Sequence, residues 1–306
     1  MPVWDAEIVI DGPLVRGLLA EQFPELDAPS ARLLGRGWDN SVWVVEERWA
    51  FRFPHRAVAV PLLEREVEVL PLVAPLLPVA VPAPRYVGRP SERYPWPFVG
   101  APLLPGCEPA VADLNERDRV ELGTALGRFL RVLHAPAVPG AVDPTGSLPV
   151  DPNRRTDMPA RVRIARAWLE ELERLGSWGA PEVVERLLSA ALDLRPASAE
   201  AVVHGDLHVR HVLVDGGALT GVIDWGDVCR ADPAVDLSLV WSLLPPGGRE
   251  AFLSEYGTVT EEQVLRARVL AVSLCAALAT FAVHEGHRRL ERETLAGLER
   301  ALVDWP

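Results

Sequence analysis

Lysine is absent from this 306-residue sequence, so all 31 basic residues are arginines. No mechanism that needs a lysine amine can therefore operate here. Cysteine is also scarce: Cys107, Cys229 and Cys275 are far apart and odd in number. They match neither a metal-binding spacing nor a disulfide framework, which predicts a reducing, cytoplasmic location.

Positive charge is in the minority, since 31 basic residues stand against 43 acidic ones and the formal net charge is −12. Proteins that bind nucleic acids need clustered positive charge, so the balance argues against a nucleic-acid partner. It gives only weak support for a cationic small molecule as partner.

Long hydrophobic runs are few. The run 69–84 is interrupted by five prolines, and the run 269–283 is shorter than the roughly 18–20 residues that a membrane span needs. We interpret the second run as a buried core helix. The first five residues show no basic stretch followed by an apolar one, so neither a signal peptide nor a membrane partner is expected.

The length predicts two domains at roughly 150 residues each, and a hydrophobic content of 49% with 24% charged residues is typical of a globular protein. Period-two patterns predict strands at 31–54, 85–88 and 97–104. Helices are predicted at 14–23 and 61–70. Residues 1–100 are thus expected to form a small, strand-rich domain.

The remainder of the chain, 101–306, has mostly helical periodicity. Helices are predicted at 116–134, 159–175, 181–194 and from 235 onwards, with a strand-rich insert at 201–224. The predicted fold class is therefore α+β, with a small β-rich domain followed by a larger helical one.

The most informative segment is the run 203–211, VHGDLHVRH, which precedes a predicted hairpin with a DGG turn at 215–217. Because a hairpin returns the chain to its starting end, Asp206 before it and Asp224 after it are expected to lie near each other. Two carboxylates, with His211 between them in sequence, suit a general base beside a divalent cation. Taken alone, Asp206 serves equally well as a turn cap and Asp224 as a strand end.

The run from His204 to His211, with IDW at 223–225, resembles the catalytic core of the aminoglycoside phosphotransferase family, which has the two-lobed fold of protein kinases. The resemblance implies that Asp206 orients and deprotonates a substrate hydroxyl and that Asp224 holds Mg²⁺. It also implies a second metal ligand at position 211, where the family usually has Asn and macrolide phosphotransferases have His. Imidazole suits Mn²⁺ better than Mg²⁺.

A glycine-containing loop, GRGWDNS at 35–41, lies between two predicted strands. Glycines allow backbone N–H groups to approach phosphates closely. The loop resembles the nucleotide-positioning loop of the family, which implicates Gly35, Gly37 and Ser41 in nucleotide binding. Without the resemblance it is an ordinary hairpin turn.

Glu66 falls near the centre of the apolar arc of the helix predicted at 61–70. A carboxylate in that position needs a buried partner, and Arg52 on the polar face of the preceding strand is the natural one. The family has a Lys–Glu pair at these places, whose basic member contacts the nucleotide phosphates. A purely structural ion pair is the alternative. The run DPAVDL at 232–237 also matches the family and implies that Asp236 braces the catalytic loop.

Together these features predict a small-molecule kinase that transfers the γ-phosphoryl group of ATP or GTP to a hydroxyl, with Mg²⁺ or Mn²⁺. The acceptor is expected to be an antibiotic, either a cationic aminoglycoside or a macrolide. A kinase of a choline-like or sugar metabolite is an alternative, and so is a nucleotide-binding module without catalysis. A third is a metal-dependent hydrolase with His204, Asp206, His208 and His211 as ligands. The protein is expected to be a monomer or a weak dimer.

Overall fold

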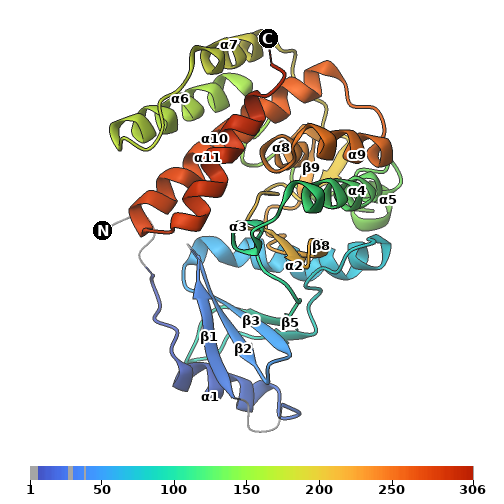
Figure 1. The fold of residues 1–306 in the computed structure, drawn as a ribbon. Helices are drawn as coiled ribbons and strands as arrows, with labels where there is room; N and C mark the ends of the chain where they lie inside the picture. The colour runs from blue at the N-terminus through green and yellow to red at the C-terminus, as the bar shows by residue number, and fades with distance from the viewer. Residues whose placement is uncertain (1–5, 27–29, 38, 306) are drawn as a thin grey trace. The chain divides into compact units, whose positions relative to one another are not determined.

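The computed structural model describes residues 6–26, 30–37 and 39–305, and the chain divides into two compact units (Figure 1). The first consists of Met1–Pro75, Ala80–Leu104 and the short segment Asp224–Asp227. The second consists of Leu76–Val79, Pro105–Ile223 and Val228–Pro306.

The first unit contains an antiparallel five-stranded sheet in the order β1-β2-β3-β5-β4. Its strands are β1 (Ala31–Arg36), β2 (Asn40–Val45), β3 (Trp49–Pro54), β4 (Tyr86–Gly88) and β5 (Phe98–Pro102). Alternation along β3 buries Phe51 and Phe53 in an aromatic cluster with Phe98. Helix α1 (Gly12–Gln22), capped by Asp11, completes this core with its apolar side chains.

Helix α2 (Val60–Val73) follows the short 3₁₀ turn η1 (Ala57–Ala59) and buries Glu66 among aliphatic residues. The helix predicted to end near Pro71 continues to Val73 and then into a second 3₁₀ turn, η2 (Ala74–Leu76). Proline fixes φ near its helical value, so Pro71 costs only its own hydrogen bond and a local distortion.

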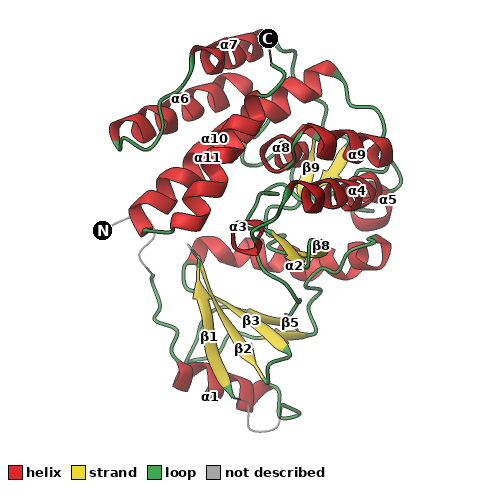
Figure 2. Ribbon diagram, viewed as in Figure 1, coloured by secondary structure: helices red, strands yellow, loops and turns green. Residues whose placement is uncertain are grey.

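The second unit is mostly helical and carries two small two-stranded sheets (Figure 2). Its helices are α3 (Pro109–Ala112), α4 (Glu116–Leu133), α5 (Val138–Val142), α6 (Met158–Arg174), α7 (Glu182–Ala190), α8 (Ala234–Leu243), α9 (Pro246–Tyr256), α10 (Glu261–Glu285) and α11 (Arg288–Leu302), with the 3₁₀ turn η3 (Ala191–Asp193). β6 (Ala201–Val203) pairs with β9 (Cys229–Ala231), and β7 (Val212–Asp215) pairs with β8 (Ala218–Val222). The second pair is the predicted hairpin.

Helix α10 is the central helix of this unit and packs against α6, α8 and α11 (Figure 1). It begins with a capping box between Thr260 and Gln263 and ends at Gly286, whose φ of 69° suits glycine. The helix is long and apolar enough to cross a membrane, but 67% of its apolar window is buried inside the protein. This confirms that the run 269–283 belongs to a core helix.

Candidate functional site

The loop that follows β6 is held by a buried carboxylate from the first turn of α8. Asp236 accepts hydrogen bonds from the backbone N–H groups of His204 (2.7 Å) and Gly205 (3.0 Å). Gly205 has a φ of 87°, which a residue with a side chain rarely adopts. The predicted bracing role of Asp236 is confirmed, and Asp206 follows directly on this fixed backbone.

A neighbouring imidazole keeps Asp236 charged. Its Oδ2 lies 3.1 Å from Nε2 of His134, whose Nδ1 lies 2.9 Å from the Tyr256 hydroxyl. Burial acts to raise the pKa of Asp236, but hydrogen bonds and charges from His134 and His204 outweigh it and hold that pKa below its usual value. The carboxylate therefore stays available to both backbone N–H groups.

His204 is occupied by the loop itself. Its Nδ1 accepts from the Asp206 backbone N–H at 3.2 Å, and its Nε2 donates to the Ile223 carbonyl oxygen at 2.9 Å. Burial lowers the pKa of His204, which favours the neutral ring. With both ring nitrogens engaged, His204 is a structural residue and offers no lone pair to a metal.

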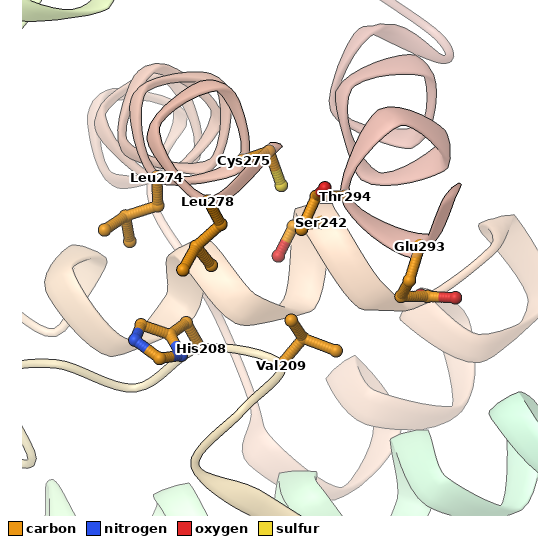
Figure 3. A pocket seen from close by; sticks show the side chains of 8 residues that line it. All are labelled: His208, Val209, Ser242, Leu274, Cys275, Leu278, Glu293 and Thr294. Carbon is orange, nitrogen blue, oxygen red and sulfur yellow. The ribbon is translucent and has the colours of Figure 1, made fainter. Parts of the chain in front are cut away.

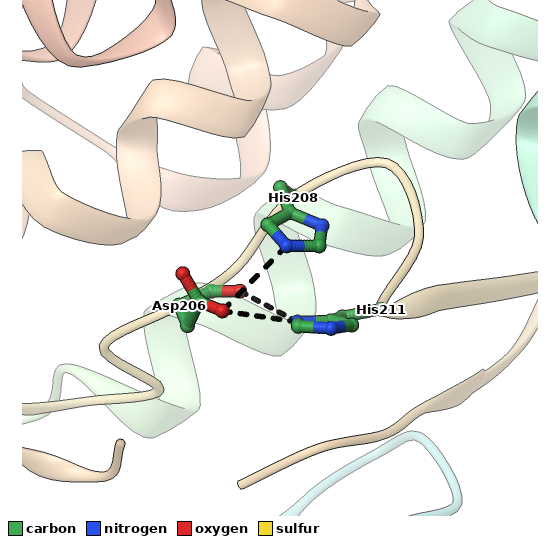
Figure 4. A group of neighbouring side chains, drawn as sticks. All are labelled: Asp206, His208 and His211. Atoms are coloured by element: carbon green, nitrogen blue, oxygen red, sulfur yellow. Dashed lines mark hydrogen bonds and ion pairs between the residues drawn. The ribbon is translucent and has the colours of Figure 1, made fainter. Parts of the chain in front are cut away.

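The Asp206 carboxylate, 24% exposed, lies beside three basic side chains, those of Arg155, His208 and His211. Figure 4 shows the two histidines. Oδ1 of Asp206 lies 2.7 Å from a terminal guanidinium nitrogen of Arg155. Its Oδ2 lies 3.5 Å from Nε2 of His208 and 3.7 Å from Nδ1 of His211. Asp206 is thus an oriented, solvent-accessible carboxylate, which is the geometry that a general base requires.

The ligand atoms of Asp206, His208 and His211 lie within 4.8 Å of one another. Hydrogen bonds assign the ring protons: Nδ1 of His208 accepts from the Arg210 N–H (3.3 Å), and Nδ1 of His211 donates to the Asp206 carbonyl oxygen (2.8 Å). In the neutral rings these bonds place the proton of His208 and the lone pair of His211 on Nε2.

In the first unit the structure brings together Arg52, Glu66 and Asp224. Arg52 forms the predicted ion pair with Glu66, whose side chain is only 2% exposed, and a second nitrogen of Arg52 lies 3.4 Å from Asp224 Oδ1. Burial lowers the pKa of Arg52, and the charge of Asp224 opposes that effect. The guanidinium thus links the carboxylate on α2 to the carboxylate of Asp224.

The segment Asp224–Asp227 packs against α2 by a second contact, in which Arg65 donates to the Gly226 carbonyl oxygen at 2.7 Å. A Cβ at Gly226 would approach Cβ of Leu62 to 3.0 Å, so a glycine suits the close packing there. Asp224 itself has a φ of 64°, an uncommon conformation for a residue with a side chain. Such conformations cluster at functional sites.

The glycine loop is only partly as the sequence predicts. Gly35 lies in β1, and a Cβ placed there would meet no atom within 4 Å. The Gly37 N–H donates to the Asn40 carbonyl oxygen at 2.8 Å and closes the turn. Ser41 is 1% exposed, with its hydroxyl 3.3 Å from Nδ1 of His55. Trp38 lies outside the described residues.

Sequence reasoning missed Arg155, whose terminal guanidinium nitrogen lies 2.7 Å from Asp206 Oδ1. Proline and aspartate in the run DPNRRTD at 151–157 signal a turn. No motif or period in the sequence indicates that this turn reaches the HGD loop.

A small cavity of about 10 Å³ lies behind the loop in the second unit, with room on the order of one water molecule (Figure 3). It is lined by His208, Val209, Ser242, Leu274, Cys275, Leu278, Glu293 and Thr294. Burial raises the pKa of Cys275 to about 12, so its thiol remains protonated. The cavity is a packing feature of the core, too small for a nucleotide or an antibiotic.

The model of the phosphotransferase enzyme family APH matches residues 30–272, which include all of the loops described above. The chain belongs to the phosphotransferase enzyme family. Its curated relatives match over shorter stretches: viomycin phosphotransferase of Streptomyces vinaceus is 49% identical over 74 residues, which are 23% of this chain and 25% of that protein. The matched stretch thus spans a quarter of that relative.

Solved structures of phosphotransferases resemble nearly the whole chain. The GDP complex of aminoglycoside 2′-phosphotransferase-IIIa is 22% identical, with a TM-score of 0.69 over 96% of this chain and 99% of that one. The apoenzyme of macrolide 2′-phosphotransferase MphH from Brachybacterium faecium is 23% identical, with a TM-score of 0.58 over 93% and 97%. These similarities confirm the predicted α+β, kinase-like fold.

Proposed function

We propose that the protein is a small-molecule kinase that transfers the γ-phosphoryl group of ATP or GTP to a hydroxyl group. The observation that carries this proposal is the partly exposed Asp206 carboxylate, on a loop that Asp236 fixes through two backbone N–H groups. Membership of the phosphotransferase family supports the same reaction class.

In the proposed reaction the acceptor hydroxyl oxygen attacks the γ-phosphorus. Its proton passes to the Asp206 carboxylate, the bond from the γ-phosphorus to the bridging oxygen breaks, and the nucleoside diphosphate leaves with that electron pair. Phosphoryl transfer demands positioning and charge stabilisation more than covalent chemistry. Asp206 therefore has to hold the hydroxyl in line with the phosphorus as well as to accept its proton.

We propose that residues 1–100 form the nucleotide-binding domain. Arg52 would contact the nucleotide phosphates while Glu66 aims its guanidinium, because such a group can bind a carboxylate and a phosphate oxygen through different edges. The backbone at Gly35, where a Cβ would meet no atom within 4 Å, and the turn closed by Gly37 are the candidate loop contacts. The burial of Ser41 argues against a direct contact between its hydroxyl and a phosphate.

His211 and Asp224 are the proposed ligands of Mg²⁺ or Mn²⁺. The donor chemistry fits, because Asp224 offers a half-exposed carboxylate and His211 carries its lone pair on Nε2. A bound cation would neutralise charge on the nucleotide phosphates. The pair comprises one hard and one borderline ligand, which favours Mn²⁺ more than two oxygen ligands would.

An antibiotic is the proposed acceptor, because the relatives named above act on viomycin, aminoglycosides or macrolides by their names. A cationic acceptor needs acidic side chains for its ammonium groups, and three acidic side chains of the second unit already have partners. Asp157 caps α6 and pairs with Arg154, Glu171 pairs with Arg174, and Glu255 pairs with Arg128. They therefore give a cationic aminoglycoside no preference over a macrolide. Choline-like and sugar acceptors belong in the same test.

The hydrogen bonds of the histidine rings argue against the alternative function of a metal-dependent hydrolase. Two of its three candidate histidines, His204 and His208, have their ring lone pairs engaged by backbone N–H groups. One imidazole and one carboxylate provide two ligands, whereas a catalytic zinc centre has three protein ligands.

The test is a panel of acceptors incubated with ATP or GTP and with Mg²⁺ or Mn²⁺, with products identified by mass spectrometry. Aminoglycosides, macrolides, viomycin, choline and simple sugars form the panel. The proposal predicts one acceptor that gains a single phosphoryl group, with matching release of nucleoside diphosphate. Zinc retained after dialysis, with nucleotide-independent hydrolysis, would contradict it. A small-molecule kinase of this kind is proposed to work in the cytoplasm, where its nucleotide is abundant.

A further inference from the structure

The catalytic-loop carboxylate has a basic partner that comes from outside the loop. A terminal nitrogen of Arg155 lies 2.7 Å from Asp206 Oδ1, and the two side chains are 14% and 24% exposed. The contact joins the segment 151–157, which precedes α6, to the HGD loop. A charged pair this close and this shielded from water is stronger than an ordinary surface ion pair.

The turn that carries Arg155 is built around one aspartate. Oδ1 of Asp151 accepts from the Arg155 N–H at 2.6 Å, and its Oδ2 accepts from the N–H (2.9 Å) and hydroxyl (2.5 Å) of Thr156. Asp151 and Arg154 have φ values of 36° and 48°. Left-handed backbone at residues with side chains is strained, and it persists where surrounding contacts enforce it.

The same turn is attached to the strand pair from which Asp206 emerges. The Asp151 N–H donates to the Arg230 carbonyl oxygen at 2.9 Å, and the Arg230 N–H donates to the Pro149 carbonyl oxygen at 2.9 Å. Arg230 lies in β9, which pairs with β6, and β6 runs directly into the HGD loop. One hydrogen-bonded frame thus sets the positions of both Arg155 and Asp206.

We propose that Arg155 is a positioning residue for phosphoryl transfer, which holds Asp206 Oδ1 so that Oδ2 receives the acceptor hydroxyl. The proposal rests on the proposed function. The terminal torsion of an aspartate is broad, so its carboxylate needs outside contacts to stay in one orientation. Arg155 supplies one on the Oδ1 side, while His208 and His211 flank Oδ2. A misplacement of about 1 Å at a reacting group can cost about 100-fold in rate.

The test compares Arg155→Ala, Arg155→Lys and Asp151→Ala with the wild type. The matched control is Arg163→Ala, which removes an exposed arginine from α6. Each variant is assayed for kcat and KM with the acceptor from the panel and for basal nucleotide hydrolysis with water as acceptor. Nucleotide Kd is measured by calorimetry, and thermal unfolding checks that each variant is folded.

We expect Arg155→Ala to lower kcat by about 10- to 100-fold while nucleotide Kd stays within about twofold. Guanidinium ion added to this variant should restore part of the rate, and Arg155→Lys should retain more activity than Arg155→Ala. Asp151→Ala should lower kcat in the same direction, and its effect should not add to that of Arg155→Ala because both act on one contact. Arg163→Ala should behave as the wild type.

Wild-type kcat in Arg155→Ala, or a loss of rate that follows only the loss of folded protein, would overturn the proposal. A faster Arg155→Ala enzyme would also overturn it, because the pair would then be an inhibitory contact. Asp206→Asn separates this failure from that of the proposed function. If Asp206→Asn abolishes transfer and Arg155→Ala does not, only the role of Arg155 is wrong; if Asp206→Asn leaves transfer unchanged, the proposed function is wrong.

Discussion

Replacement of Glu66 by alanine should destabilise the first unit and weaken nucleotide binding together. Glu66 is 2% exposed and its ion-pair partner Arg52 is 17% exposed. Among the described residues, Glu66 Oε1 and Arg52 Nε have no hydrogen-bond partner. The pair is therefore held by the contact between a terminal nitrogen of Arg52 and Glu66 Oε2. Without Glu66, the guanidinium stays partly buried, and Asp224, at 3.4 Å, is the acidic partner that the described residues leave to it.

The expected loss of stability in Glu66→Ala follows from that geometry. Removal of one member of a buried ion pair costs about 3–5 kcal/mol, because the other charge is left uncompensated. Asp224 lies 3.4 Å from Arg52 but is 51% exposed, so solvent screens its attraction and it offsets at most about 1 kcal/mol. We therefore expect a loss of about 3 kcal/mol, which corresponds to a Tm lower by roughly 6–12 °C.

The assay is thermal and urea unfolding of Glu66→Ala, beside nucleotide titration of the more conservative Glu66→Gln. Glu64→Ala is the control, since Glu64 is an exposed glutamate on the same helix and should change stability by less than about 0.5 kcal/mol. Glu66→Gln should raise the nucleotide KM because Arg52 is less well aimed. Equal stability of Glu66→Ala and Glu64→Ala, with unchanged nucleotide KM in Glu66→Gln, would refute the reasoning.

Two further predictions concern metal and pH. Asp224→Ala should remove the metal-dependent part of nucleotide binding, measured by calorimetry with a non-hydrolysable nucleotide with and without Mg²⁺; an unchanged metal dependence would argue against its role as a ligand. Burial lowers the pKa of His204 below its value in the unfolded chain, so the unfolded state binds more protons below about pH 6.5 and stability is lost as pH falls. The pKa of Asp236 is also lowered, which adds a loss below about pH 4. Urea unfolding should give a smaller free energy of unfolding at pH 5 than at pH 7, because of the lowered pKa of His204. A larger free energy of unfolding at pH 5 would contradict this prediction.

Local patterns explain why much of the fold was predictable from the sequence. Alternation along β3 and the DGG turn before β8 are encoded within a few residues, as is the periodicity of α4. The Arg52–Glu66 pair was predictable for the same reason, because a carboxylate inside an apolar helix face requires a partner. Such signals depend on hydrophobic burial, which the sequence displays directly.

Features set by tertiary contacts were not predictable in this way. Strand β9 has three residues and is stabilised by its pairing with β6, so it shows no period of its own. The burial of Ser41 depends on His55 from the end of β3. Arg155 reaches Asp206 through a turn held by side-chain hydrogen bonds, which no hydrophobic pattern marks.

The most direct test of the account is phosphoryl transfer by Asp206→Asn compared with the wild type, measured as phosphorylated acceptor by mass spectrometry at saturating nucleotide. Asparagine keeps the shape of the side chain but cannot take the hydroxyl proton. The account predicts a rate lower by about 10²–10⁴, with the variant folded and its nucleotide Kd unchanged. A near-wild-type rate in Asp206→Asn would contradict it.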